Sequence, residues 1–227
     1  EWKELKKSVT RILNNGGLDP KRIEELEQIT KHDVIAFTTA LAEQVGPVAR
    51  YVHFGLTSSD VVDTSWSLLI QEAGVQLQTG VRRLCEALRI QAENYRDLPT
   101  IGRSHGIHAE PTSFGLKFLA AYTEWCRNEV RLERALAQMR YGKLSGAVGV
   151  SPHWSPDVEE RILKTLGLKR EPVSTQVIPR DRHAELLSVF AICGSSIERL
   201  TVEFRHLQRS EVGEVLESFT QGQKGSS

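Results

Sequence analysis

Residues 58–95, SSDVVDTSWSLLIQEAGVQLQTGVRRLCEALRIQAENY, determine the fold class. Apolar side chains recur here every three or four positions, a repeat of about 3.5 residues that is typical of helices packed almost parallel in a bundle. They are Val62, Trp66, Leu69, Ala73, Leu77, Val81, Leu84 and Leu88. A helix of this length extends roughly 55 Å at about 1.5 Å per residue. We therefore expect an extended bundle of long helices.

Two further segments have the same spacing, one over residues 111 to about 139 and one over residues 181 to about 217. Shorter helices are expected after Asp19, after Asp33 and after Ser155, where capping residues precede apolar repeats. No window alternates like a strand. The pattern predicts an all-α protein, with a small helical N-terminal domain over residues 1–56 and a long-helix bundle over residues 57–227.

The composition argues against several classes of protein. Lysine plus arginine equals aspartate plus glutamate at 29 each, so no net field attracts nucleic acid or an anionic membrane. Cys85, Cys126 and Cys193 are odd in number and lack CxxC spacing, which indicates reduced thiols rather than a disulfide or zinc framework. No stretch approaches ~18 consecutive apolar residues. We expect a soluble, cytoplasmic protein without a nucleic-acid or membrane partner.

The connectors between the predicted long helices are themselves long and polar. Residues 99–113, 142–156 and 166–181 are rich in glycine, serine, threonine and histidine. Connections in helical bundles usually take about 2–8 residues. The excess length predicts loops that bind a ligand.

The first of these loops contains a candidate general acid. In GRSHGIHAEP, residues 102–111, His105 and His108 lie between glycines and a predicted helix. A histidine with a pKa near 7 suits the protonation of a leaving amine. Two other interpretations stay open: both histidines lie in an ordinary surface loop, or they bind a metal, although a third ligand at suitable spacing is missing.

The start of the first long helix is a candidate anion site. Thr57, Ser58 and Ser59 follow His53 and place hydroxyl groups where free backbone N–H groups favour a carboxylate or phosphate. Simple helix capping is the alternative.

Two weaker candidates flank these segments. His32 could contact phosphate with Asp33 setting its orientation, or could simply end a helix. Gln176 and Arg180 could contact a base and a phosphate, although a solvated helix start explains this region equally well.

Six segments in order resemble the fumarase/aspartase superfamily, and most closely its adenylosuccinate lyases. They are KHDVIAF (31–37), YVHFGLTSSDVVDT (51–64), GRSHGIHAEPTSFG (102–115), KLSGAVG (143–149), STQVIPRDRH (174–183) and GQKGSS (222–227). The resemblance implies a homotetramer around a twenty-helix bundle, with active sites shared between three subunits. It implies anti β-elimination of fumarate from adenylosuccinate, giving AMP, and from the succinyl-aminoimidazole-carboxamide ribotide of purine biosynthesis. No metal or organic cofactor is expected.

The resemblance also implies roles for individual residues. His105 is the general acid, and Ser226 is the base on a mobile signature loop, with Ser227 as its rival. The substrate-binding residues implied by the matched segments are His32, Asp33, His53, Thr57, Ser58, Ser104, Gln176 and Arg180.

The resemblance further suggests a chain shortened at both ends, because most of the signature loop is missing. We expect the piece alone to be inactive and the complete protein to be active. Two alternatives remain: another lyase of the superfamily, of the argininosuccinate lyase or carboxymuconate cycloisomerase type, or a helical scaffold without catalytic activity.

Overall fold

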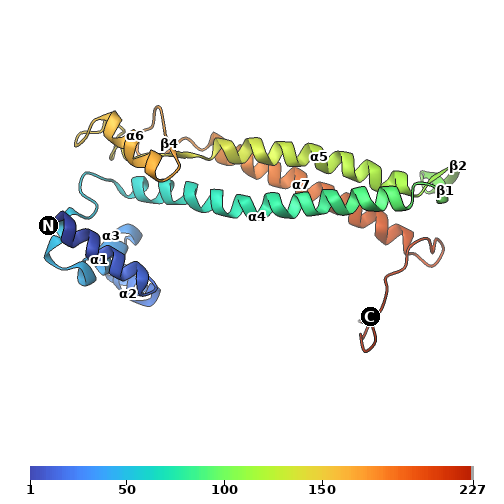
Figure 1. The fold of residues 1–227 in the computed structure, drawn as a ribbon, viewed down its shortest axis with the longest axis horizontal. Coiled ribbons are helices and arrows are strands. Elements are labelled where there is room, and N and C mark those ends of the chain that lie inside the picture. The colour runs from blue at the N-terminus through green and yellow to red at the C-terminus, as the bar shows by residue number, and fades with distance from the viewer. Residues whose placement is uncertain (226–227) are drawn as a thin grey trace. The chain divides into compact units, whose positions relative to one another are not determined.

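The computed structural model describes residues 1–225 and is predominantly helical, which confirms the predicted all-α class (Figure 1). The described helices are α1 (Trp2–Asn14), α2 (Pro20–Thr30), α3 (Asp33–Val45), the 3-10 helix η1 (Pro47–Tyr51), α4 (Ser58–Asn94), α5 (Gly115–Gln138), α6 (Pro156–Thr165) and α7 (Asp181–Leu207). The strands are β1 (Pro99–Ser104), β2 (Ile107–Ser113), β3 (Tyr141–Gly142) and β4 (Lys169–Arg170).

The chain divides into two compact units, each built from two stretches of sequence. Unit 1 contains residues 1–72 and 138–180, and unit 2 contains residues 73–137 and 181 onward. Helix α4 contributes its first part to unit 1 and the rest to unit 2. The predicted division into domains at residues 56 and 57 stays a prediction.

The small helices of unit 1 begin and end where the sequence provides caps. The Asp19 carboxylate accepts a hydrogen bond of 3.0 Å from the Lys21 backbone N–H, and Pro20 occupies the first turn of α2. Lys31 then ends α2 with a φ of 52°. Helices α1 to α3 and η1 enclose two small apolar clusters, formed by Leu5, Ile12, Val45 and Val48 and by Leu26, Ala36 and Ala40.

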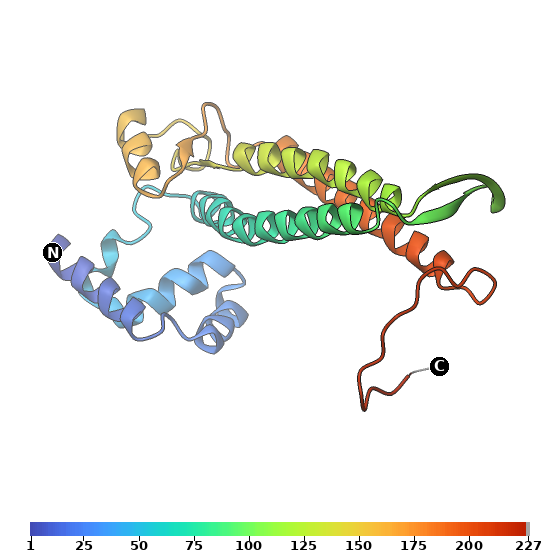
Figure 2. The same ribbon diagram turned by 45° about the vertical axis from the view of Figure 1, so that its right-hand side comes forward.

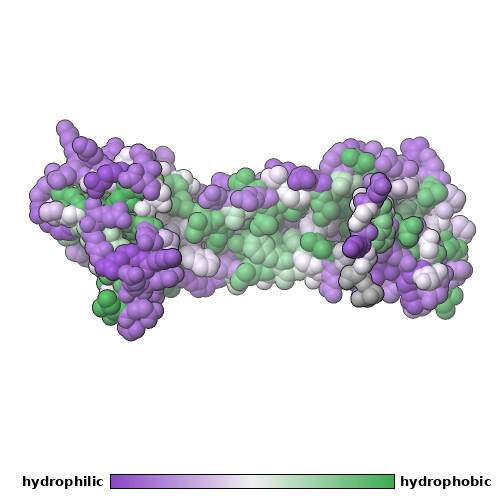
Figure 3. Space-filling model, turned by 90° about the horizontal axis from the view of Figure 1, so that it is seen from below, coloured by the Kyte–Doolittle hydropathy of each residue, from purple (hydrophilic) through white to green (hydrophobic). Residues whose placement is uncertain are grey.

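Unit 2 is a bundle of the second part of α4 with α5 and α7, which lie side by side in both ribbon views (Figures 1 and 2). Its core consists of Cys85, Leu88, Ala92, Phe114, Phe118, Ala121, Trp125 and Leu207. The predicted apolar stripe of α4 is only partly buried, since Trp66, Leu69 and Leu77 are exposed. In the space-filling view, hydrophobic residues gather along the long helices (Figure 3).

Three expectations about these elements were wrong. Residues 99–113, predicted as a polar connector, form an antiparallel hairpin in which Thr100 pairs with Thr112 and Arg103 with His108. Because β2 occupies residues 107–113, α5 starts at Gly115 rather than near residue 111. Helix α7 ends at Leu207, about ten residues before its predicted end, and the chain turns back there onto the helix end.

None of the described helices combines the length and the apolar character needed to cross a lipid bilayer.

Candidate active site

The hairpin of unit 2 presents His105 at its tip. His105 and Gly106 have φ values of 57° and 77°, and positive φ at both central residues is characteristic of a type I′ turn. Ser104, the last residue of β1, and His105 are both exposed. The turn thus holds an imidazole outside the bundle, available to a ligand.

A cavity of about 400 Å³ lies beside this turn. Its polar lining comes from the hairpin, from α5 and from around the end of α7: Arg103, Lys117, Glu203, His206 and Arg209. Lys117 pairs with Glu203 at 2.6 Å, and Arg103 pairs with Glu214 at the same distance. The cavity is therefore polar, with most of its cations already engaged.

In unit 1, the structure brings His32 and Ser58 together from two different sequence segments. His32 Nδ1 accepts a hydrogen bond of 3.4 Å from the Ile35 backbone N–H and caps α3. Its Nε2 lies 3.3 Å from the Ser58 hydroxyl oxygen at the start of α4. Which of these two atoms donates depends on the tautomer of the ring. Asp33 Oδ1 lies 3.2 Å from Nδ1.

The start of α4 is capped by Asp60. Asp60 Oδ2 accepts a hydrogen bond of 2.9 Å from the Thr57 backbone N–H, which is one half of a capping box. The capping interpretation is therefore correct for the backbone of Thr57. Among the described residues the Thr57 hydroxyl has no hydrogen-bond partner, so it stays available to a ligand.

A buried ion pair lies beneath this helix start. The Lys143 ammonium donates to Asp60 Oδ1 and, at 3.1 Å, to the Gly146 carbonyl, and both charged side chains are completely buried. Asp60 Oδ2 also accepts from the Gly146 backbone N–H at 3.0 Å, while Thr64 bonds to the Lys143 backbone. The segment KLSGAVG is thereby fixed against the helix that presents Thr57 and Ser58.

His53 adopts an unusual conformation in the turn before α4. Its φ is 64°, a value uncommon outside glycine. Its Nε2 is buried and has no partner among the described residues. A buried nitrogen without a partner is costly and therefore marks a position where a ligand could supply the missing hydrogen bond.

The last predicted pair lies in the loop before α7. Arg180 donates to Asp63 Oδ1 at 2.8 Å, and the Ile178 backbone N–H donates to the other carboxylate oxygen at the same distance. Half of the Arg180 side chain stays exposed, and Gln176 is exposed as well. Within the described residues, no hydrogen bond joins either of them to His32 or Ser58.

Comparison with known proteins identifies the family. Residues 1–227 of the chain match the lyase family. The chain belongs to this lyase family. It is 53% identical to the curated adenylosuccinate lyase of Thermotoga maritima over 224 residues, covering 98% of this chain and 52% of that protein. The adenylosuccinate lyase of Aquifex aeolicus is 50% identical over 207 residues, covering 91% of this chain and 47% of that protein. The chain spans about half the length of these curated relatives.

Solved structures show the same fold as this lyase chain. A fumarate lyase from Mesorhizobium sp. BNC1 superposes with a TM-score of 0.84 at 24% identity, covering 91% of this chain and 49% of that one. A β-carboxy-cis,cis-muconate cycloisomerase from Acinetobacter calcoaceticus superposes with a TM-score of 0.83 at 24% identity, covering 93% of this chain and 50% of that one. These two likenesses concern the fold alone.

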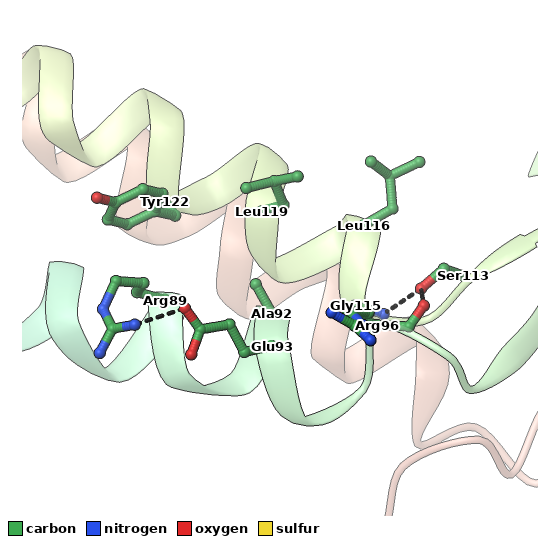
Figure 4. A pocket seen from close by; sticks show the side chains of 9 residues that line it. All are labelled: Arg89, Ala92, Glu93, Arg96, Ser113, Gly115, Leu116, Leu119 and Tyr122. Carbon is green, nitrogen blue, oxygen red and sulfur yellow. Dashed lines mark hydrogen bonds and ion pairs between the residues drawn. The ribbon is translucent and has the colours of Figure 1, made fainter.

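Other features of the lyase chain do not coincide with the predicted site. A cavity of about 470 Å³ between α4 and α5 is lined by Arg89, Glu93, Leu119 and Tyr122 among others, and by none of the predicted site residues that the structure describes (Figure 4). The described residues contain no cluster of three metal-ligating side chains. Ser226 and Ser227 lie outside the described residues.

Sequence reasoning missed several residues that build the site. Asp60, Asp63 and Lys143 make the contacts that fix the helix start and the Arg180 loop. Thr57 and Asp60 match the Ser/Thr-x-x-Asp/Glu pattern of a capping box, which would have identified Asp60. Nothing local indicates Lys143, because its partner lies 83 positions away.

Proposed function

We propose that this chain is part of an adenylosuccinate lyase, which releases fumarate from adenylosuccinate to give AMP and from the succinyl-aminoimidazole-carboxamide ribotide of purine biosynthesis. The observation that carries the proposal is the 53% identity to an adenylosuccinate lyase, which extends over 98% of the chain. The muconate-type relatives share only 24–25% of their residues with it.

The start of α4 has the chemistry needed to bind the carboxylate next to the carbon that loses a proton. Deprotonation there moves negative charge onto the carboxylate, and donors aimed at that charge stabilise the transition state. The hydroxyls of Thr57 and Ser58 stand at a helix N-terminus, where the helix dipole also favours an anion. His32 Nε2, 3.3 Å from the Ser58 hydroxyl oxygen, orients that hydroxyl.

The hairpin supplies the proposed acid. His105 would protonate the departing nitrogen while Ser226 removes the proton from the opposite face, which gives anti elimination. A neutral serine is a poor base, so its hydroxyl must be activated by nearby dipoles or cations. His53, with its unsatisfied Nε2, is proposed as a second active-site histidine, and Asp33, Ser104, Gln176 and Arg180 as ligand contacts.

We propose that the complete protein is a homotetramer with active sites shared between subunits. Large apolar side chains stay exposed on the long helices, including Leu77 on α4, Leu119 on α5 and Leu187, Phe190 and Ile197 on α7. Contiguous apolar surface of this kind marks protein interfaces. A cytoplasmic location without metal or organic cofactor belongs to the same proposal, in keeping with the free cysteines of the described chain.

A substrate panel tests this proposal. The full-length protein is incubated separately with adenylosuccinate, argininosuccinate and carboxymuconate, and the products are separated by chromatography. We expect fumarate and AMP from adenylosuccinate and no turnover of the other two. Turnover of either competitor without turnover of adenylosuccinate would refute the assignment. Ligand binding without turnover of any substrate would favour the non-catalytic scaffold.

A further inference from the structure

The segment after α7 is anchored at one point before it continues toward Ser226. Gly213 has a φ of 61°, and its backbone N–H donates to the Arg209 carbonyl at 2.8 Å. The backbone N–H groups of Glu214 and Val215 both donate to the Leu207 carbonyl, at 3.0 and 3.3 Å. These bonds turn the chain back onto the last turn of α7 and fix the backbone of Glu214.

The Glu214 side chain joins this anchor to the hairpin. One carboxylate oxygen accepts from Arg103 Nη2 at 2.6 Å, and the other accepts from the Thr100 hydroxyl at 3.1 Å. Both charged side chains are about one-fifth exposed, at 23% for Arg103 and 21% for Glu214. The hydrogen bonds from Arg103 and Thr100 lower the pKa of Glu214, so the carboxylate is charged at neutral pH.

The contacts of Glu214 with Arg103 and Thr100, which we call the clamp, connect the strand that leads to His105 with the segment that leads to Ser226. Thr100 and Arg103 lie on β1, and Arg103 precedes His105 by two residues. Glu214 precedes Ser226 by twelve residues. Beyond Val215, which packs against the bundle core, the next large apolar residues are solvent-exposed: Leu216 at 90% and Phe219 at 62%. The Glu214–Val215 pair thus ends the packed part of this segment.

We propose that Glu214 is a positioning residue that holds the His105 hairpin in register with the start of the segment carrying Ser226. The inference rests on the proposed function. A strand held at two side chains cannot swing freely, and a shift of about 1 Å in a reacting group can cost roughly 100-fold in rate. Glu214 does not itself touch the reacting atoms in this proposal. It acts through Arg103 and Thr100.

The first test is hydrogen exchange of the hairpin in the full-length protein. Glu214→Gln keeps the shape of the side chain but removes the charge that binds Arg103. We expect faster amide exchange over residues 99–113 than in wild type. Glu211→Gln is the matched control, because Glu211 lies in the same segment, is exposed and, among the described residues, has only a long side-chain contact of 3.6 Å with Arg209. Equal exchange in all three proteins would refute the clamp.

The second test separates positioning from general stability. With adenylosuccinate, Glu214→Gln should lower kcat about tenfold or more while KM changes less than about threefold, since substrate binding residues are untouched. Glu211→Gln should match wild type. Unchanged kcat despite faster hairpin exchange would overturn the positioning role. Absence of turnover in the wild-type protein would instead contradict the proposed function, while hydrogen exchange would still decide whether the clamp exists.

Discussion

The ion pair between Lys143 and Asp60 stabilises unit 1 and also fixes part of the proposed site. Both groups are fully buried, and the pair is completed by backbone hydrogen bonds from Gly146 and Thr57. Removing charges from water is expensive, so such a pair is stable only when its remaining donors and acceptors are satisfied. The same contacts hold the helix start that carries Thr57 and Ser58, the proposed carboxylate-binding residues.

Replacing Lys143 with methionine should therefore destabilise the protein strongly. Asp60 would be left as a buried, unpaired charge, and losing one partner of such a pair costs about 3–5 kcal/mol. Thermal and urea unfolding followed by circular dichroism would measure the loss. Arg22→Ala removes an exposed pair with Glu43 and should change the midpoint little. Similar midpoints for both variants would contradict the structure around Asp60.

Cys85 provides a pH-dependent prediction. Burial raises the pKa of its thiol to about 11, against a normal value of 9.0. The folded state therefore favours the protonated thiol, and the resulting stability is present below pH 9 and lost as the pH rises toward 11. At pH 8, iodoacetamide should modify Cys85 in the native protein far more slowly than in urea, as measured by mass spectrometry. Equal rates would mean that α4 is not packed as described.

Most residues of the candidate site could be named from the sequence, but their positions relative to one another could not. His32 and Ser58 were expected in separate segments, and only the fold places them 3.3 Å apart. The partner of Arg180 could not be predicted, because Asp63 lies 117 positions away in the sequence. Local sequence patterns indicate candidate functional side chains and helix caps. Contacts between distant segments depend on how the helices and strands pack.

Among the secondary-structure elements, the three long helices and the short helices α2, α3 and α6 were predicted, whereas α1 and the hairpin were not. Apolar residues repeat over α4, α5 and α7, and caps such as Asp19 and Gly46 set the bounds of the short helices. Residues 99–113 have no such periodicity, because β1 is mostly half-buried, β2 is largely exposed, and neither strand has an apolar face that alternates with a polar one. The dipeptide His105-Gly106 was the available signal, since a type I′ turn requires two residues that tolerate positive φ.

Gly106 should be required for the order of this hairpin. A Cβ atom at this position would meet no neighbour within 4 Å, so Gly106→Ala tests the positive φ alone. Adopting that conformation costs an L-residue roughly 1–2 kcal/mol. Trypsin should then cut after Arg103 roughly 5–30 times faster. Gly80→Ala, in the exposed part of α4, is the control and should not accelerate this cleavage. No change with Gly106→Ala would argue against the turn.

At the scale of the whole molecule, the exposed apolar surface of the long helices is the feature that supports the proposed assembly. The periodic stripe could be recognised in the sequence, yet the sequence does not distinguish residues buried within the chain from those left exposed. Leu186 and Val189 of α7 are buried, while Leu187 and Phe190, one position further on, are exposed. A second apolar face on one helix indicates a second packing partner.

Introducing a charge on that second face should weaken assembly of the full-length protein. Leu187→Glu would place a carboxylate in the proposed interface, so light scattering after gel filtration should detect a mass below that of a tetramer. Leu13→Glu changes a similarly exposed leucine on the short helix α1 and should leave the mass unchanged. A tetramer that persists with Leu187→Glu would exclude this face from the interface.

The most direct test of the account measures turnover of adenylosuccinate by the full-length protein with single histidines replaced. His105→Gln should lower kcat roughly 10²–10⁴-fold, because the departing nitrogen loses its proton donor. His108→Gln, which changes an equally exposed histidine of the same hairpin, should retain turnover near that of wild type. Fumarate release at nearly the wild-type rate by His105→Gln would contradict the proposal that His105 is the general acid.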